Sequence, residues 1–259
     1  MLTIELTGKV ALVIGGSRGI GAGIVQALAQ AGADTVFTHT GNPAHASRVE
    51  SLLAEIRQAG GQAEAAVVDA CDSARTTELA NRIVAQRGHL DILVHNAGHN
   101  TARPAVQVTD EQWQAEIDLN LSSAFYSVRA VLPHMLRQKR GRIVLIGSSA
   151  AYDGGGGAIE YAAGKAGLVG MMLYLIRAYA RQGILTNVVH PAVIETDLLR
   201  ERYADAAAKQ KLIAAIPVGR LGQVQDIAGL VAYLASSWGD YICGQEFLLD
   251  GGRTVFGNK

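Results

Sequence analysis

Short apolar segments rich in β-branched residues alternate with longer segments of helical pattern along almost the whole chain. Seven segments have the length and composition of strands: Val10–Ile14, Thr35–Thr38, Ala65–Val68, Ile92–His95, Ile143–Ile146, Leu185–Val189 and Glu246–Leu249. The helical patterns cover Gly19–Ala31, Ala44–Ala59, Ser73–Gln86, Thr109–Arg137, Tyr161–Arg181 and Val224–Leu234. Such alternation produces right-handed βαβ units, and strands that are apolar throughout are buried on both faces. The sequence therefore predicts a single-domain α/β fold over residues 1–259, a Rossmann-type doubly wound parallel β-sheet with helices on both faces.

Three local features refine this prediction. Ser73 is the expected N-cap of its helix. Pro133 is expected to bend or interrupt the last turns of the long helix that begins near Thr109. Residues 197–216 break the strict alternation, because they follow the sixth predicted strand and are helical in pattern and rich in alanine and charge. This stretch is a candidate lid over a substrate.

The charges of the chain are balanced, with 23 basic and 23 acidic residues. Without a field of one sign, we expect binding neither to nucleic acid nor to a membrane surface. The two cysteines, Cys71 and Cys243, have no metal-binding or redox spacing, so we expect no metal and a reducing compartment. The N-terminus has no signal-peptide pattern and no window resembles a membrane span, which predicts a cytoplasmic protein.

The first predicted strand runs directly into a glycine-rich loop that opens the first helix. Glycines here permit a tight turn and let the backbone approach a pyrophosphate, while the helix N-terminus offers free N–H groups and a positive dipole end. The strand before the loop and the helix after it give the motif the context of a dinucleotide site. The residues expected to contact a dinucleotide are Gly15, Ser17, Arg18, Gly19, Ile20 and Gly21.

The segment after the second predicted strand bears on the choice between NAD and NADP. An acidic residue at this point would bind the ribose 2′-hydroxyl and repel a 2′-phosphate. Residues Phe37–Asn42 include no acidic side chain, whereas Arg18, His39 and Thr40 offer a cation and polar groups. The sequence therefore favours NADP(H) over NAD(H).

Tyr161 and Lys165 lie four residues apart at the start of a predicted helix and so share one face. A tyrosine with a reference pKa of about 10 is a poor acid or base at neutrality. A nearby ammonium favours the phenolate and would bring that pKa toward the range of an acid–base catalyst. Ser148 and Ser149 follow the fifth predicted strand, at the edge where parallel α/β sheets bind their ligands, and either hydroxyl could hold a substrate oxygen.

Together, these motifs resemble those of the short-chain dehydrogenase/reductase family. The resemblance rests on the GxxxGxG spacing of the glycine loop, on the Tyr161 and Lys165 pair, and on Ser148 thirteen residues before Tyr161. It extends to Leu249–Gly252 near the C-terminus and covers nearly the whole chain. The stretches GRIVLIGS, NVVHP and PVGRLG are most similar to the 3-oxoacyl-(acyl carrier protein) reductase branch.

Three positions depart from the family pattern. Ile14 stands where the family usually has Thr, His95 where it has Asn, and Ala192 where it has Gly. We interpret His95, and also His190 before the last of these positions, as structural residues.

The resemblance implies that Asn120, Ser148, Tyr161 and Lys165 are the catalytic residues. Tyr161 would exchange a proton with the substrate oxygen, and Ser148, which the family spacing selects over Ser149, would hold that oxygen. Lys165 would lower the Tyr161 pKa and bind the nicotinamide ribose. Asn120, on the long predicted helix, would support a water-bridged proton relay with Lys165.

The resemblance also implies further contacts with the dinucleotide, at the adenine, along the loop after the fourth strand and at the nicotinamide carboxamide. With Tyr161 and Lys165, the expected residues are Asp69, Ala70, Asn96, Ala97, Gly98, Pro191, Ile194 and Thr196.

The implied activity is NADP(H)-dependent reduction of a ketone or 3-oxoacyl carbonyl to the secondary alcohol. Members of this branch dock an acidic acyl carrier protein through basic residues near the active site. Lys139 matches one such position and Gln182 occupies the other, which leaves room for a free small-molecule carbonyl substrate. Gly154–Gly157, beside Tyr152, predict a mobile and roomy pocket wall.

Two alternatives remain at this point. The chain could oxidise a sugar alcohol or another small secondary alcohol with NAD(P), with Glu160 and His99 meeting substrate hydroxyls. The second and least favoured alternative is a non-catalytic dinucleotide-binding sensor, which the intact Tyr161 and Lys165 pair disfavours. Family members commonly form tetramers through the last strand and the helix before it, so we expect a homotetramer.

Overall fold

The centre of the protein is a seven-stranded sheet in which all neighbouring strands are parallel, in the order β3-β2-β1-β4-β5-β6-β7. The computed structural model describes residues 3–196, 199 and 205–256. The strands are β1 (Val10–Ile14), β2 (Asp34–His39), β3 (Gln62–Val67), β4 (Ile92–His95), β5 (Gly141–Ile146), β6 (Ile184–Pro191) and β7 (Glu246–Leu249). All seven predicted strands are present, and the predicted fold class is confirmed.

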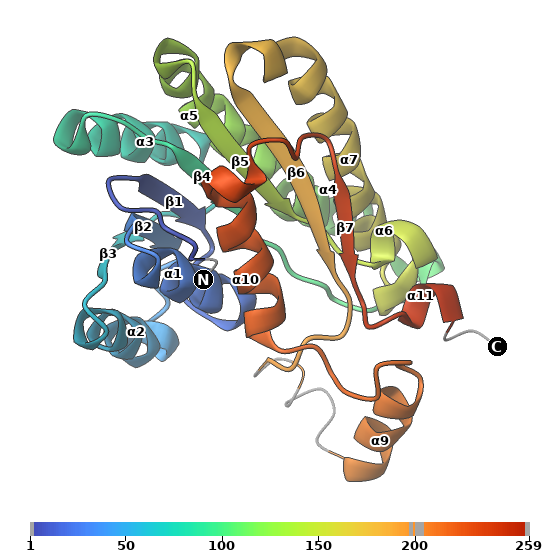
Figure 1. The fold of residues 1–259 in the computed structure, drawn as a ribbon. Helices are drawn as coiled ribbons and strands as arrows, with labels where there is room; N and C mark the ends of the chain where they lie inside the picture. The colour runs from blue at the N-terminus through green and yellow to red at the C-terminus, as the bar shows by residue number, and fades with distance from the viewer. Residues whose placement is uncertain (1–2, 197–198, 200–204, 257–259) are drawn as a thin grey trace.

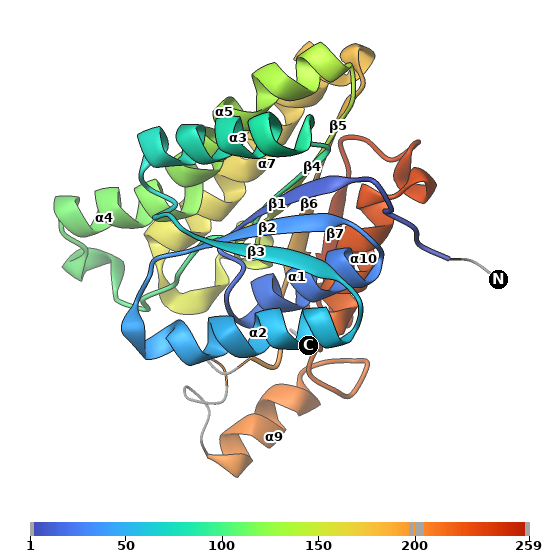
Figure 2. The same cartoon turned by 90° about the vertical axis from the view of Figure 1, so that its left-hand side faces the viewer.

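Helices cover both faces of this sheet (Figures 1 and 2). One layer consists of α1 (Gly19–Gln30), α2 (Ala46–Gln58) and α10 (Val224–Ala235), and the other of α3 (Ser73–Arg87), α5 (Ser123–Gln138) and α7 (Ile159–Tyr179). Each layer has its own apolar core against the sheet, because the side chains of each strand alternate between the two faces. The shorter helices are α4 (Asp110–Ile117), α6 (Ala150–Asp153), α9 (Ala206–Ala214) and α11 (Arg253–Phe256).

The strand order reverses between β1 and β4, since β1 continues to β2 on one side while β4 lies on the other. The chain therefore leaves the carboxyl ends of these two strands in opposite directions. In open α/β sheets, the crevice outside this point is where ligands bind. A ligand site is therefore expected at the loops that follow β1 and β4.

The long predicted helix is present and contains a π-helical turn. It begins as predicted at Thr109, whose side chain forms a capping box with Gln112, but a π-helical turn over Asp118–Ser122 separates α4 from α5. Pro133 does not interrupt the helix, because it lies inside α5, which continues to Gln138; the alternative that it bends the helix stays a prediction. The π-helical turn has its physical cause at Asn120, whose side-chain amide donates to the Glu116 carbonyl and competes with the main-chain ladder.

The predicted N-cap of α3 is also wrong by one residue. The Asp72 carboxylate accepts a hydrogen bond from the Arg75 backbone N–H at 2.9 Å, and Ser73 is the first residue of the helix. Both side chains are good caps, and the carboxylate adds a favourable interaction with the helix dipole.

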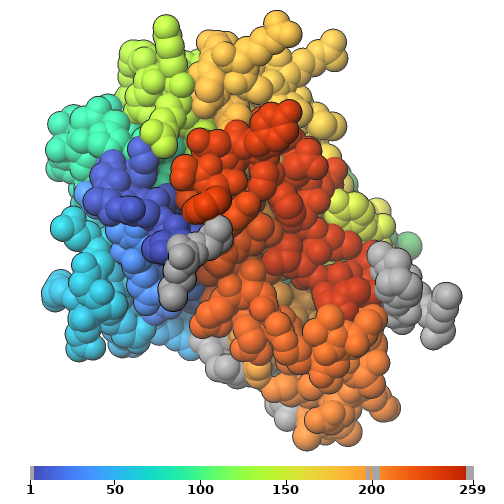
Figure 3. Space-filling model, viewed as in Figure 1, coloured from blue at the N-terminus to red at the C-terminus, as the bar shows by residue number. Residues whose placement is uncertain are grey.

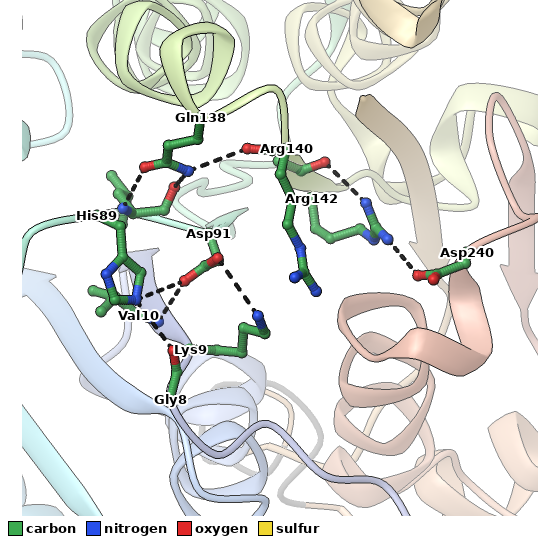
Figure 4. Close-up of polar contacts among 11 residues, drawn as sticks. Gly8, Lys9, Val10, His89, Asp91, Gln138, Arg140, Arg142 and Asp240 are labelled. Carbon is green, nitrogen blue, oxygen red and sulfur yellow. Dashed lines mark hydrogen bonds and ion pairs between the residues drawn. The ribbon is translucent and has the colours of Figure 1, made fainter. Parts of the chain in front are cut away.

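A cluster of buried polar groups lies at the amino ends of the central strands (Figure 4). Asp91, which is 6% exposed, accepts a hydrogen bond from the Val10 N–H at 3.0 Å and lies 3.9 Å from Lys9 Nζ and 3.2 Å from His89 Nε2. Arg142, on β5, donates to Asp240. The Asp91 contacts tie the starts of β1 and β4 together, and the Arg142 contact ties the start of β5 to the segment after α10.

The candidate lid is described only in part. Residues 197–198 and 200–204 of the predicted 197–216 stretch lie outside the described residues, and α9 forms within the remainder. Helix α9 projects as a corner of the molecule in the space-filling view (Figure 3). Whether the stretch acts as a lid stays a prediction.

One helical stretch, residues 159–182, passes the length and hydropathy test for crossing a membrane, which differs from the expectation that no window would. Such a result is weak evidence, because core helices of soluble proteins pass the same test. Helix α7, which makes up most of this stretch, packs on β6 and carries the buried Lys165 toward the sheet.

Candidate active site

The loop after β1 is held in a tight turn that only glycine accommodates. Gly15 has φ +78°, and a Cβ on Gly21 would lie 2.1 Å from the Gly15 carbonyl oxygen. The helix that follows has Arg18 as its N-cap residue, with no side-chain hydrogen bond to the first N–H groups of α1. These donors and the positive end of the helix dipole are available to an anionic ligand.

Two neighbouring strands support this loop. The Asn96 side-chain amide donates to the Gly15 carbonyl at 2.7 Å, and Thr38 Oγ1 accepts from the Gly15 N–H at 3.0 Å. Thr38 therefore gives the loop a hydroxyl contact although Ile14, where the family usually has Thr, is fully buried and apolar. Gly21 serves this close approach of the loop to β4 and does not line the cleft described below.

A cleft of about 560 Å³ opens at the carboxyl ends of the strands, where the strand order reverses. All but three of the predicted site residues line it: Gly15, Ser17, Arg18, Gly19, Ile20, His39, Thr40, Asp69, Ala70, Asn96, Ala97, Gly98, Ser148, Tyr161, Lys165, Pro191 and Thr196. The structure thus brings together residues from loops after β1, β2, β3, β4, β5 and β6. The three exceptions are Gly21, Asn120 and Ile194.

Ile194 contributes to the core rather than to the cleft. It is 6% exposed and forms an isolated parallel bridge with Gly222. Its neighbour in the motif, Thr196, does line the cleft and lies beside Gly19, on which a Cβ would be 3.4 Å from Thr196 Cγ2.

Arg18 is the charged group at the β2 end of the cleft. His39 lines the same region, but burial lowers its pKa, and its Nδ1 accepts a hydrogen bond from the Gly41 N–H at 3.2 Å. An imidazole that accepts at Nδ1 is neutral. A smaller adjoining cleft of about 300 Å³ places Ser47 and Arg48 of α2 near Arg18.

Ser148, Tyr161 and Lys165 meet on one wall of the cleft. Ser148 follows β5, its Oγ accepts from the Ala150 N–H at 3.2 Å, and it forms a side-chain hydrogen bond with Tyr161. Lys165 is 3% exposed, and its Nζ donates to the Ile146 carbonyl at 3.0 Å and lies 5.9 Å from the centroid of the Tyr161 ring. The hydroxyls of Ser148 and Tyr161 are therefore adjacent, with the ammonium behind them.

The electrostatics of this wall differ from the expected lowering of the Tyr161 pKa by Lys165. Burial raises the Tyr161 pKa, the hydrogen bond with Ser148 opposes that rise, and the Glu116 carboxylate adds to it. Burial also lowers the Lys165 pKa to about 8. Near neutrality, Tyr161 thus carries its proton and Lys165 is still largely an ammonium.

Asn120 lies behind the wall and is completely buried. Its Oδ1 accepts from the His99 N–H at 3.2 Å, and its Nδ2 donates to the His99 carbonyl and to the Glu116 carboxylate. A Cβ on Gly98 would lie 2.7 Å from Lys165 Nζ and 2.8 Å from Asn120 Oδ1. Gly98 therefore lets the asparagine oxygen and the ammonium approach from either side, and the π-helical turn places Asn120 for this contact.

Glu160, which the sequence suggested as a contact for substrate hydroxyls, points away from the cleft. Its side chain is completely buried, lies 3.7 Å from Arg103 Nε and does not line the cleft. Residues 154–157 do not line the cleft either, and their segment is tied to the chain after β4 by the hydrogen bonds of Asn100 with Gly156 and of Arg103 with Gly157. Gly156 nevertheless lies beside Asn100 and Tyr161, which do line the cleft, and the mobility of these glycines stays a prediction.

Several lining residues were missing from the sequence prediction. They come from the end of β2, from the loop after it and from the chain that follows β4: Thr38, Asn42, His45, Asn100 and Leu119. His99, which the sequence did suggest, also lines the cleft. Proximity to the strand ends was the available signal, because each of these loops leaves the carboxyl edge of the sheet.

Comparison with known proteins agrees with this geometry. The family model described as Enoyl-(Acyl carrier protein) reductase matches residues 14–254. The chain is 40% identical over 249 residues to the 3-oxoacyl-[acyl-carrier-protein] reductase FabG of Escherichia coli strain K12, covering 96% of this chain and 98% of that protein. It is 35% identical over 252 residues to the 3-oxoacyl-[acyl-carrier-protein] reductase of Synechocystis, covering 97% and 99%.

A solved structure extends the likeness to three dimensions. The gluconate 5-dehydrogenase from Burkholderia cenocepacia, crystallised in complex with NADP and tartrate, superposes with a TM-score of 0.88 at 32% identity, covering 97% of both chains.

Proposed function

Because this chain belongs to the short-chain dehydrogenase/reductase family of NAD(P)-dependent oxidoreductases, we propose that it uses NADPH to reduce a ketone or 3-oxoacyl carbonyl to the secondary alcohol. One observation carries the proposal: the hydrogen-bonded hydroxyls of Ser148 and Tyr161 lie on the cleft wall with Lys165 behind them. A carbonyl oxygen placed between two hydroxyls is polarised for addition at its carbon.

The chain supplies the proton and the positioning in this reaction. When bound, the reduced nicotinamide supplies a hydride to the carbonyl carbon. Tyr161, which burial keeps protonated, donates its proton to the carbonyl oxygen while Ser148 holds that oxygen. Lys165, an ammonium near neutrality, binds the nicotinamide ribose, and Asn120 holds Oδ1 near Lys165 for a water-bridged path that returns the proton to Tyr161. The product gains one hydride and one proton in total.

The residues around the cleft fit a dinucleotide phosphate. The tight turn at Gly15 and the uncapped N–H groups of α1 offer a cradle for the pyrophosphate. Asp69 and Ala70 line the same cleft, and we assign them to the adenine on the family resemblance. Near Arg18, no carboxylate lies in residues 40–42, the segment that follows β2. This distribution of charge favours the 2′-phosphate of NADP(H) over the free hydroxyl of NAD(H).

The structure bears on the choice between carrier-bound and free substrates. Lys139 and Gln182 precede β5 and β6, so they lie at the amino edge of the sheet, whereas Ser148 follows the carboxyl end of β5. A carrier protein that docked on Lys139 and Gln182 would therefore lie at the opposite edge of the sheet from the cleft of the same chain. We therefore propose a free small ketone as the preferred substrate, with 3-oxoacyl chains on a carrier protein second.

A second candidate function is oxidation of a sugar alcohol or another small secondary alcohol. His99 and Asn100 line the cleft and offer polar groups to hydroxyls, although Glu160 does not. The Burkholderia cenocepacia neighbour is a gluconate 5-dehydrogenase in complex with a polyhydroxy acid. A non-catalytic sensor stays the least favoured reading, because Ser148, Tyr161 and Lys165 converge on the cleft.

We further propose a cytoplasmic homotetramer. Phe125 on α5 and Leu173 and Tyr174 on α7 are 46%, 52% and 65% exposed, which is unusual for large apolar side chains on one helical layer. The last strand and the helix before it, β7 and α10, would supply the second interface that the family resemblance implies. Light scattering on the purified protein would measure its mass in solution and so test the proposed tetramer.

The proposed activity is tested with a panel of ketones and alcohols assayed in parallel with NADPH and NADH. We expect a steady decrease of NADPH absorbance with ethyl acetoacetate and a slower rate with NADH. Turnover only of polyols with the oxidised nucleotide would favour the second candidate. No turnover of any carbonyl or alcohol would contradict both.

A further inference from the structure

His190, at the end of β6, packs directly against the main chain that carries Ser148. Its side chain is completely buried, and its Nδ1 lies 3.2 Å from the Ser148 N–H nitrogen and 3.0 Å from the Ser148 carbonyl oxygen. Gly147 makes this approach feasible, because a Cβ there would be 2.4 Å from Nδ1. The imidazole is therefore in a position to fix where the Ser148 main chain lies.

The other side of the imidazole faces Glu246, the first residue of β7. Glu246 Oε2 lies 3.4 Å from His190 Nε2 and accepts a hydrogen bond from the Tyr152 hydroxyl at 2.6 Å. The rings of Tyr152 and His190 meet edge to face, with centroids 5.1 Å apart. Three side chains from α6, β7 and β6 thus lie in a row that ends at the Ser148 main chain, although the 3.4 Å contact between His190 Nε2 and Glu246 is not a hydrogen bond.

The contacts of His190 distinguish its two neutral tautomers. Burial lowers the His190 pKa, and the Lys165 ammonium also disfavours a second cation, so the ring is neutral and has one N–H. A carboxylate only accepts hydrogen bonds, so Glu246 favours the N–H on Nε2. Nδ1 then accepts from the Ser148 N–H at 3.2 Å, although it also lies 3.0 Å from the Ser148 carbonyl oxygen. In the opposite tautomer, Nδ1 would donate to that carbonyl, but the Ser148 N–H would lose its acceptor and the lone pair on Nε2 would face the charged Glu246 carboxylate.

We propose that Tyr152, Glu246 and His190 are positioning residues that hold the Ser148 main chain through one tautomer of His190. Tyr152 fixes the Glu246 carboxylate, Glu246 places the proton on Nε2, and Nδ1 anchors the Ser148 N–H. The proposal rests on the proposed function in assigning Ser148 to the substrate oxygen. The placement of the Ser148 main chain matters for holding that oxygen, because a displacement of about 1 Å in a reacting group can cost about 100-fold in rate.

The tautomer is measured directly by ¹⁵N NMR on protein labelled at histidine, with the His190 signals assigned by their loss in His190→Asn. We expect a protonated Nε2 and an unprotonated Nδ1 in the wild type. Glu246→Leu, which removes the acceptor, should shift His190 toward the Nδ1–H form, whereas Glu246→Gln retains an acceptor oxygen and should restore the wild-type signals. A wild-type protein with the proton on Nδ1, or a Glu246→Leu variant with unchanged signals, would overturn the proposal.

Kinetics on the same variants test the consequence for Ser148. We expect Glu246→Leu to lower kcat about tenfold with an unchanged NADPH Kd, Tyr152→Phe to lower it less, and Glu246→Gln to recover most of the loss. Glu78→Leu and Tyr241→Phe are matched controls at exposed positions, and thermal midpoints report whether each variant folds. An unchanged kcat in a folded Glu246→Leu variant contradicts the proposal. If the wild type reduces no carbonyl, the proposed function fails, and the NMR result still decides the tautomer.

Discussion

Buried polar groups at the two edges of the central sheet differ in how much of their hydrogen-bonding capacity the protein itself uses. At the amino edge, Asp91 has the Val10 N–H, Lys9 and His89 around its carboxylate, and Arg142 has Asp240, although Arg142 Nε makes no hydrogen bond (Figure 4). At the carboxyl edge, the buried Lys165 donates to the Ile146 carbonyl, yet an ammonium has three N–H donors.

The difference separates groups that stabilise the fold from groups that are available for chemistry. A carboxylate whose lone pairs are occupied by the protein stabilises the strands that supply its partners. A buried cation and a buried hydroxyl with unused hydrogen-bonding capacity, both facing a cleft, are costly for folding and are retained where a ligand completes their contacts. This contrast predicts that substitutions at the two edges have separable effects.

Substitution of Lys165 should have the largest effect on turnover. We expect Lys165→Met to lower kcat on the order of 100-fold, because the ammonium that binds the ribose and supports the proton path is lost. The free energy of unfolding should stay the same or rise, because an apolar side chain replaces a buried charge. Steady-state kinetics measure kcat, and urea unfolding measures the free energy of unfolding.

Lys9→Met is the matched control for this variant at the amino edge. Lys9 lies 3.9 Å from Asp91 and is far from the cleft, so kcat should be unchanged. A similar loss of turnover in both variants would contradict the separation of the two edges.

Substitution of Asp91 should have the converse effect. Asp91→Ala leaves the Val10 N–H without its acceptor, which should lower the free energy of unfolding by about 2 kcal/mol. The kcat and the NADPH Kd of the folded protein should be unchanged. Glu78→Ala, at an exposed position on α3, is the control and should cost less than about 1 kcal/mol. A loss of cofactor affinity in folded Asp91→Ala would show that the edges are coupled.

Arg18→Ala tests a second difference, between the part of the cleft near Arg18 and the part near Ser148 and Tyr161. We expect the NADPH Kd to increase about tenfold, or ~1.4 kcal/mol, with no change for NADH, because only NADPH carries the 2′-phosphate. Arg57→Ala, at another exposed position, should change neither value. Equal losses for both nucleotides would assign Arg18 to the pyrophosphate instead.

The pH dependence should show the smallest effect. Burial lowers the Lys165 pKa to about 8, so the ammonium is lost as the pH rises through that value, before Tyr161, whose pKa is raised. Turnover at saturating NADPH should therefore fall by about half at the pH that equals this pKa. The free energy of unfolding should increase above it, because the unfolded chain then holds more protons than the folded chain. Constant turnover well above this pH would contradict the assignment.

Much of the fold and most of the site could be predicted from the sequence. The strands are continuous apolar runs, and their alternation with helical patterns determines a parallel sheet. Because the motifs around Gly15, Asn96 and Ser148 each follow a strand, their meeting at one edge follows from the topology.

Other features depend on contacts that the local pattern does not contain. The π-helical turn at Asn120 arises from side-chain hydrogen bonds with His99 and Glu116, while the apolar periodicity continues through it. Glu160 precedes Tyr161 in sequence, yet the rotation of α7 turns it away from the cleft and toward Arg103. The direction of the Tyr161 pKa shift follows from burial, which spacing along a helix does not report.

The central claim is that Tyr161 is the proton donor for carbonyl reduction, and Tyr161→Phe tests it most directly. The variant removes one hydroxyl and keeps the ring in place. We predict that NADPH oxidation with ethyl acetoacetate falls by about 10²–10⁴-fold, while the NADPH Kd is unchanged and the free energy of unfolding does not decrease. Turnover within about threefold of the wild type in a folded Tyr161→Phe variant would contradict the account, because another group would then supply the proton.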